Sequence, residues 1–311
     1  MKDSFSAYHP FLNLFYFAVV IGLGMFLVHP VYVAISFVCA CCYNAMLLGF
    51  QKGVMERLRL LLPLMLLVTA INGLFNHYGV TTLFYVKGTN AVTLEALTFG
   101  LVMAIMMASM LMWFSCCTCV MTTDKFLYLF GKVFPAISMI LSMCLRFVPE
   151  FSQQAKKITA ARTGIGKGTQ GEGFFVRCKR TIEIFSILIT WGMENGVDTA
   201  DSMGARGYGF IGRTSFSLFR FETRDKTLAA CMGIMSLMLF AGILKGYSYA
   251  SYNPEIVLEG GASPTACILY VLYGVFCLIP VFLELSERYK WKKIKENMDV
   301  STQEGVRLWE S

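Results

Sequence analysis

Two arginines stand out because each follows an alanine at the end of a helical pattern and has a glycine within the next two residues. They lie in the sequences Ala161-Arg162-Thr163-Gly164 and Ala205-Arg206-Gly207. A planar guanidinium at a helix end can pair bidentately with carboxylates, and small neighbours let a partner surface come close. The pattern therefore predicts that Arg162 and Arg206 enter acidic grooves on another protein. The alternative is that each arginine only complements the carbonyls at its own helix end, where a cation is favoured.

The chain lacks a recognisable motif for nucleotide hydrolysis. The segment 164–169 (Gly-Ile-Gly-Lys-Gly-Thr) resembles a phosphate-binding loop, but that loop needs Gly-Lys followed directly by Ser or Thr, after a buried strand. Here Gly168 intervenes and a helical pattern precedes. His9, His29 and His77 are far apart in the sequence, and no nucleophile stands near a base. We predict that the chain is not an enzyme and has neither catalytic residues nor a cofactor.

Eleven cysteines raise the question of a metal site. Six of them form two clusters within apolar segments: Cys39, Cys41, Cys42, Cys116, Cys117 and Cys119. Neither cluster has a histidine or carboxylate beside it to complete a ligand set. We predict no metal site and interpret these thiols as small reduced side chains that pack helices.

The composition indicates the kind of scaffold that holds the arginines. The chain has 56% hydrophobic and 15% charged residues, whereas a soluble domain has roughly a quarter charged residues. Crossing a bilayer takes about 20 apolar residues, and six stretches without Asp, Glu, Lys or Arg approach this length: 11–28, 31–50, 60–76, 96–121, 227–244 and 265–283. The predicted fold class is an all-α integral membrane protein with about six transmembrane helices and a cytoplasmic helical coupling lobe.

The basic residues predict the orientation, because cytoplasmic loops are enriched in Lys and Arg. The presumed outer loops contain one basic residue, Lys87. The other side holds Lys52, Arg57, Arg59, the segment 122–226 and a C-terminal tail with five basic residues between 288 and 295. We predict a multi-pass protein of the plasma membrane with both termini in the cytoplasm. The net charge of +7 then reflects topology and lipid headgroups, and we expect no nucleic-acid partner.

The predicted organisation has three parts. Residues 1–121 contain transmembrane helices 1–4, residues 122–226 form the cytoplasmic coupling-helix region, and residues 227–311 contain helices 5–6 and the basic tail. Within the middle part we predict a helix over 123–150 that enters and leaves the membrane surface, and further helices over 151–162 and 174–205. A small hairpin is predicted over 81–93, followed by Thr93 as a helix cap.

Two apolar faces are candidates for contact with a membrane partner. One is the methionine-rich part of the fourth span, Met103, Met106, Met107 and Met110; the other lies in the lobe and comprises Ile184, Ile187, Leu188 and Trp191. Methionine is flexible and polarizable, so such a face can adapt to differently shaped partners. Packing within the chain's own interior explains both sets equally well, and the sequence does not decide.

Further motifs accompany the two arginine sites. They are Tyr8-His9-Pro10, the loop 72–79, Thr93-Leu94-Glu95-Ala96, Thr123-Asp124-Lys125-Phe126, Ser142-Met143-Cys144-Leu145-Arg146-Phe147-Val148-Pro149, Ala205-Arg206-Gly207-Tyr208 and Arg224-Asp225-Lys226. Together they resemble the transmembrane T component (EcfT/CbiQ type) of energy-coupling-factor (ECF) ABC transporters. The likeness covers almost the whole chain, with Thr163 as a departure where glycine is common.

The resemblance implies a function. In that family two Ala-Arg sites end two crossing cytoplasmic coupling helices, one for each of two ABC ATPase subunits, and a membrane S component captures a vitamin or transition metal. Arg206 matches the second site and Arg162 the first. The competing hypothesis is a stand-alone secondary transporter or channel, but the charge-free spans argue against ion-coupled transport. The substrate is not identified by this sequence.

Overall fold

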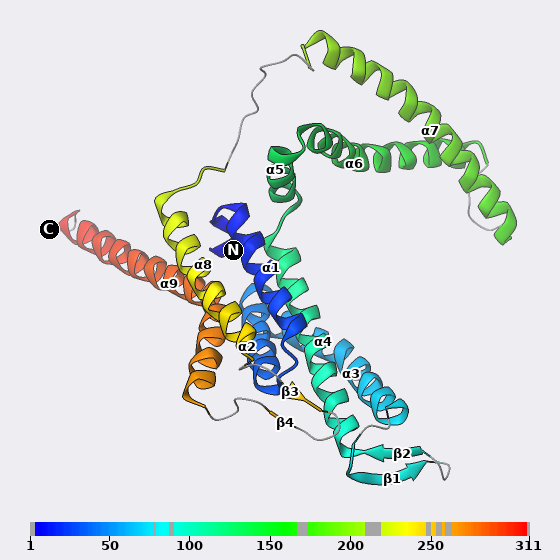
Figure 1. Ribbon diagram of the computed structural model, residues 1–311. Coiled ribbons are helices and arrows are strands. Elements are labelled where there is room, and N and C mark those ends of the chain that lie inside the picture. The colour runs from blue at the N-terminus through cyan, green and yellow to red at the C-terminus, as the bar shows by residue number, and fades with distance from the viewer. Residues whose placement is uncertain are drawn as a thin grey trace. The chain divides into compact units, whose positions relative to one another are not determined.

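The computed structural model of the chain describes residues 4–76, 79–86, 90–166, 173–208, 219–246, 250–252, 257–258 and 263–309. These residues are mostly helical (Figure 1). They form two compact units: unit 1 is Met1–Lys125 with Phe219–Ser311, and unit 2 is Phe126–Leu218. The predicted outer-loop residue Lys87, His77 and residues 167–169 of the glycine-rich loop lie outside the described residues.

Within the described ranges, unit 1 contains six apolar helices. They are α1 (Pro10–Phe26), α2 (Pro30–Leu48), α3 (Glu56–Phe75), α4 (Leu94–Val120), α8 (Thr223–Leu244) and α9 (Pro264–Trp309). Five have the length and composition to cross a membrane, and α1 is a shorter apolar helix. The 17 residues of α1 span about 25 Å, near the lower limit for a membrane span. The prediction of an all-α integral membrane protein is confirmed, with five long helices and one short one.

Short elements join these helices. They are the 3-10 turn η1 (Phe5–Ala7), the π-helix η2 (Phe50–Met55) and the strands β1 (Thr82–Val86), β2 (Asn90–Thr93), β3 (Ala250–Ser251) and β4 (Val257–Leu258). Strands β1 and β2 pair antiparallel, which confirms the predicted hairpin. Thr93 then caps α4, as predicted, because its Oγ1 accepts a hydrogen bond of 3.3 Å from the Ala96 N–H.

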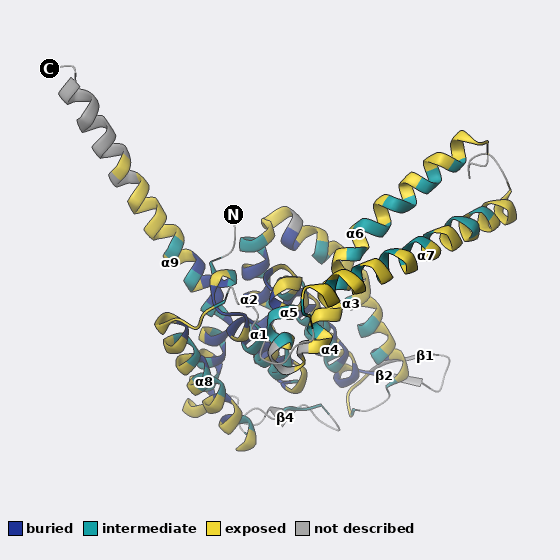
Figure 2. Cartoon of the chain, turned by 90° about the horizontal axis from the view of Figure 1, so that it is seen from above, coloured by how far each residue is buried: buried dark blue, intermediate teal, exposed yellow. Residues whose placement is uncertain are grey.

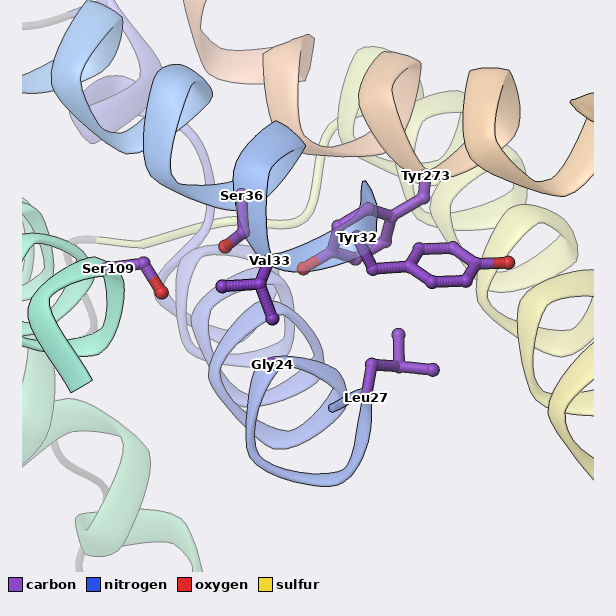
Figure 3. Close-up of a pocket in the computed structure, with 7 residues that line it drawn as sticks. All are labelled: Gly24, Leu27, Tyr32, Val33, Ser36, Ser109 and Tyr273. Carbon is purple, nitrogen blue, oxygen red and sulfur yellow. The ribbon is translucent and has the colours of Figure 1, made fainter. Parts of the chain in front are cut away.

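Aromatic side chains fill the core of unit 1 between α1, α2, α4 and α9. Tyr16 donates a 2.8 Å hydrogen bond to the Cys277 carbonyl, and Trp113 donates one of 3.0 Å to Ser36 Oγ. Such pairing is needed because an unpaired polar group costs several kcal/mol away from water. Figure 3 shows a small gap in this core, lined by Gly24, Leu27, Tyr32, Val33, Ser36, Ser109 and Tyr273, that has no room for a water molecule. It is a gap in the packing and too small for a transported solute.

The N-terminal residues 4–10 form a hub that several elements of unit 1 contact. The buried Lys125 ammonium donates to the Ser6 carbonyl at 2.7 Å, to Ser6 Oγ at 2.8 Å and to the Val120 carbonyl at 2.9 Å. The Arg224 guanidinium lies 4.7 Å from the centre of the Tyr8 ring. Lys125 is the last residue of unit 1 before the chain enters unit 2, and Arg224 follows soon after its return. The N-terminal hub therefore holds both places where unit 2 is joined to unit 1.

Unit 2 contains most of α5 (Thr123–Val133) and all of α6 (Pro135–Gly164) and α7 (Phe174–Ala205). In Figure 2, α6 and α7 lie side by side and are coloured intermediate and exposed. Helix α7 has the predicted bounds. The prediction of one helix over 123–150 and another from residue 151 was wrong, because the interruption lies at Phe134 and α6 runs through Pro149.

The position of this interruption has a local cause. Phe134 precedes a proline, which disfavours helical backbone at that residue, and it has φ −132° and ψ 81°. The Ser138 hydroxyl donates a 3.1 Å hydrogen bond to the Leu127 carbonyl across the break. Pro149 lacks an N–H and is tolerated inside α6 at a local cost.

Candidate functional site

Helix α7 ends in a Schellman motif that places Arg206 at its tip. The Tyr208 N–H donates to the Met203 carbonyl at 3.1 Å, and the Gly207 N–H donates to the Gly204 carbonyl at 3.0 Å. Gly207 has φ +73°, a left-handed conformation that glycine adopts without a Cβ clash. The helix therefore stops at Arg206, and both Arg206 and the preceding Ala205 are exposed.

Arg162 occupies a different position in its helix. Helix α6 continues past Arg162 to Gly164, and the left-handed residue is Gly166, with φ +78°. Thr163 stands where the second site has Gly207, and a β-branched residue does not favour positive φ. Thr163 instead stays helical, and its hydroxyl donates a 2.8 Å hydrogen bond to the Thr159 carbonyl. Arg162 therefore lies inside the last turn of α6, whereas Arg206 ends α7.

Arg162 also has an internal partner. Its guanidinium forms an ion pair with Glu183 of α7, and the two side chains are 15% and 43% exposed. The Arg162 Nε is buried without a hydrogen-bond partner. The exposed neighbours of Arg162 are Ala161 and Thr163. Arg162 is thus less accessible than the exposed Arg206, and a role for either arginine in partner binding stays a prediction.

The packing of α6 on α7 sets how far apart the two arginines lie. The rings of Phe151 and Trp191 meet edge to face with their centroids 5.6 Å apart. Contacts at Arg162–Glu183 and Phe151–Trp191 run in opposite directions along the two helices, so the pair is antiparallel there. Arg206 follows Glu183 by 23 residues, which is roughly 34 Å at 1.5 Å per residue. One small acidic groove cannot reach both arginines.

The predicted apolar face of α7 is divided between two surroundings. Ile184, Leu188 and Trp191 are half-buried, and Trp191 packs on α6, whereas Ile187 is exposed. A second set is exposed and continues further along α7: Ile182, Phe185, Ile189, Met193 and Val197. We call this set the α7 outer stripe. The apolar face predicted from the sequence ended at Trp191 and did not reach Met193 and Val197, although their spacing of four residues follows the helical period.

The sequence left open whether the methionines of α4 contact a partner or pack in the protein interior, and the structure shows them in an intermediate position. Met103, Met106, Met107 and Met110 are all half-buried. The Met110 Cε lies 3.7 Å from where a Cβ on Gly24 would stand, so this side chain packs near α1. Met112 is fully buried. Part of each half-buried methionine is left for contact with lipid or with a partner.

The described residues offer no cluster for inorganic chemistry. Among them, no group of three or more His, Cys, Asp or Glu side chains lies close enough to hold a metal ion. Cys39, Cys116 and Cys277 are buried cysteines within the helical bundle. What the site presents is a cation at a helix end beside small residues.

Comparison with known proteins gives relatives for part of the chain. No family model matches it. An energy-coupling factor transporter transmembrane protein, EcfT, of Listeria innocua is 31% identical over 105 residues, which are 33% of this chain and 40% of the relative. EcfT of Brevibacillus brevis is 30% identical over 33% of this chain and 39% of its own length. EcfT 1 of Listeria monocytogenes is 32% identical over 35% of this chain and 40% of its own length.

The alignments thus span about two-fifths of the length of these curated relatives. The names of these relatives describe transmembrane proteins of a transporter, in agreement with the apolar helices of unit 1. These names are those of a transporter subunit rather than of an enzyme. The resemblance is confirmed over the matched third of the chain, where this multi-pass membrane protein is similar to the EcfT-type T components of energy-coupling factor transporters. The likeness over almost the whole chain stays a prediction.

Proposed function

We propose that this chain is the energy-coupling subunit of an ECF-type importer. It passes ATP-driven motion from two ATPase subunits to a separate membrane S component that binds a vitamin or a transition metal. Hydrolysis takes place in the partner subunits. The observation that supports this most is the exposed Arg206 at the Schellman-terminated tip of α7. The orientation that follows has both termini and unit 2 in the cytoplasm.

Arg206 suits contact with an acidic groove for two reasons. The helix ends directly at this residue, so no further turn of α7 separates the guanidinium from a partner. Ala205 and Gly207 have little or no side chain, which lets the partner backbone come close. A guanidinium in such a groove makes charge-assisted, bidentate hydrogen bonds that fix its orientation as well as its position.

Arg162 can bind a second ATPase subunit if its guanidinium leaves Glu183 and pairs with a carboxylate of that subunit. Glu183 is 43% exposed, and an ion pair with such exposure contributes about 0–1 kcal/mol. A partner carboxylate that is better desolvated outcompetes a pair of this strength. Before the partner arrives, Glu183 holds the guanidinium near α7 and limits its conformational freedom. The distance of roughly 34 Å between the sites suits two ATPase subunits.

Motion reaches the membrane helices through the N-terminal hub. The chain leaves unit 1 after Lys125 and returns at Phe219. Lys125 is bonded to Ser6, and the ring of Phe221 lies 4.7 Å from that of His9. A displacement of the chain at Lys125 or at Phe221 therefore also displaces the residues at the start of α1. The α7 outer stripe and the α4 methionines are the apolar surfaces proposed for the S component.

Substitutions at the first site test the exchange. We expect Arg162→Ala to reduce recovery of ATPase subunits with the affinity-tagged full chain. We expect Glu183→Gln to preserve or raise that recovery, because the competing carboxylate is gone while the guanidinium remains. Recovery is measured by quantitative immunoblotting of the purified complex in detergent.

The opposite pattern would contradict the exchange. If Glu183→Gln lowered ATPase recovery as much as Arg162→Ala, the pair would be a structural link between α6 and α7. The melting temperature of each variant serves as the control, and a change of about 1 kcal/mol in stability is expected, because the Glu183 side of this partly buried pair is open to water.

A further inference from the structure

A groove between α3 and α4 combines a cation with an apolar floor. Its volume is about 420 Å³, within the range of roughly 300–1,000 Å³ that is usual for small-molecule sites. Residues from the first turns of α3 and the last turns of α4 line it: Arg57, Leu60, Leu61, Leu111, Met112, Phe114, Ser115 and Thr118. The arginine belongs to the N-terminal end of α3, so the polar part lies at the edge of the apolar helices.

A neutral side chain holds the cation in place. The Arg57 Nη1 donates a 2.7 Å hydrogen bond to Asn44 Oδ1. The amide of Asn44 is itself fixed, because its Nδ2 donates to the Met112 carbonyl at 2.9 Å and to Cys116 Sγ at 3.0 Å. In the part of the chain that the structure describes, the ion pairs are formed by other arginines. The Arg57 charge is thus oriented by an amide that does not neutralise it.

The floor of the groove is exposed apolar surface. Leu60 is 74% exposed and Phe114 is 53% exposed. Only 11% of the most apolar part of α3 is buried inside the protein. Most of this helix is therefore available to lipid. A cation beside hydrocarbon is costly unless an anion accompanies it. The occupant that matches both surfaces has an anionic head and an apolar chain.

We propose that this groove binds one anionic phospholipid. The phosphate pairs with the Arg57 guanidinium, which has N–H donors beyond the one used by Asn44. The first part of an acyl chain lies along Leu60, Leu111 and Phe114. Basic pockets between transmembrane helices at a membrane surface are suited to acidic headgroups.

Native mass spectrometry of the full chain in detergent tests the proposal. Dioleoyl phosphatidylglycerol and dioleoyl phosphatidylcholine are titrated separately, and we expect at least tenfold stronger retention of one phosphatidylglycerol. Arg57→Ala is expected to abolish this preference. Arg59→Ala is the matched control, because Arg59 is exposed on the same helix, carries the same charge and does not line the groove; it is expected to bind like the unchanged chain.

A second variant keeps the test independent of the Arg57–Asn44 hydrogen bond. Thr118→Phe places a ring in the groove without removing charge, and we expect it to lower retention of phosphatidylglycerol while the melting temperature is maintained. Inorganic phosphate at millimolar concentration is expected not to displace the lipid.

Three results would overturn the proposal. One is equal loss in Arg57→Ala and Arg59→Ala, which would indicate a general basic surface. Another is displacement by inorganic phosphate alone. The third is unchanged lipid retention in Arg57→Ala together with lost recovery of a membrane partner, which would make the groove a protein interface. None of these outcomes depends on Arg206, so they are separable from failure of the proposed function.

Discussion

Replacing Arg206 by alanine is expected to weaken binding of an ATPase subunit by roughly 30- to 3,000-fold. The estimate follows from the loss of one member of a desolvated charge pair, which costs about 2–5 kcal/mol, with 1.4 kcal/mol for each factor of ten. The fold of α7 is expected to persist, because Arg206 is exposed and Gly207 still ends the helix. Affinity is measured by titrating ATPase subunits onto the immobilised full chain in nanodiscs.

Two control variants make this result specific. Arg206→Lys retains the charge but loses the planar fork, and an intermediate loss of affinity is expected. Arg177→Ala removes an exposed arginine from the first turns of the same helix, and less than a twofold change is expected. Equal affinities for Arg206→Ala and Arg177→Ala would show that the tip of α7 is not the point of contact.

Replacing Lys125 by methionine is expected to destabilise unit 1 by roughly 3 kcal/mol. Lys125 is 4% exposed, and its ammonium donates to the carbonyls of Ser6 and Val120 and to the Ser6 hydroxyl. Methionine preserves the length of the apolar stem but leaves these acceptors unpaired, at about 1–3 kcal/mol for each buried group. A large drop in the melting temperature in detergent is the expected measurement.

Lys125→Met is also expected to change function in a way that a substitution at the protein surface does not. Because Lys125 joins the N-terminal hub to the start of α5, ATPase binding is expected to survive while uptake per ATP hydrolysed falls. Lys156→Met, at an exposed position of α6, is the control and is expected to change neither property. A melting temperature for Lys125→Met within one degree of the unchanged chain would show that the hub does not depend on this ammonium.

Features with a strong local cause could be predicted from the sequence. The transmembrane helices follow from long stretches without charge, and α7 has its predicted bounds because Gly173 precedes its first residue and Gly207 follows its C-cap, Arg206. The Thr93 cap could be predicted because a threonine hydroxyl at this position can accept a hydrogen bond from a backbone N–H in the first turn of the helix. In these places the local preference and the final structure agree.

Features that depend on packing between distant residues could not be predicted. The Arg162–Glu183 pair requires α6 to lie antiparallel on α7, which the helical period of either segment does not specify. Lys125 was interpreted as part of a helix start, whereas its ammonium reaches residues more than a hundred positions away. The break at Phe134 was missed because apolar residues continue on both sides of Pro135.

The most direct test of this account is the subunit composition of the complex purified with the affinity-tagged full chain from its native membrane. Native mass spectrometry is expected to show two ATPase subunits for each copy of the chain, and the Arg162→Ala, Arg206→Ala double variant is expected to lose them while remaining folded. Recovery of both ATPases with the double variant, with hydrolysis still coupled to uptake, would contradict the account.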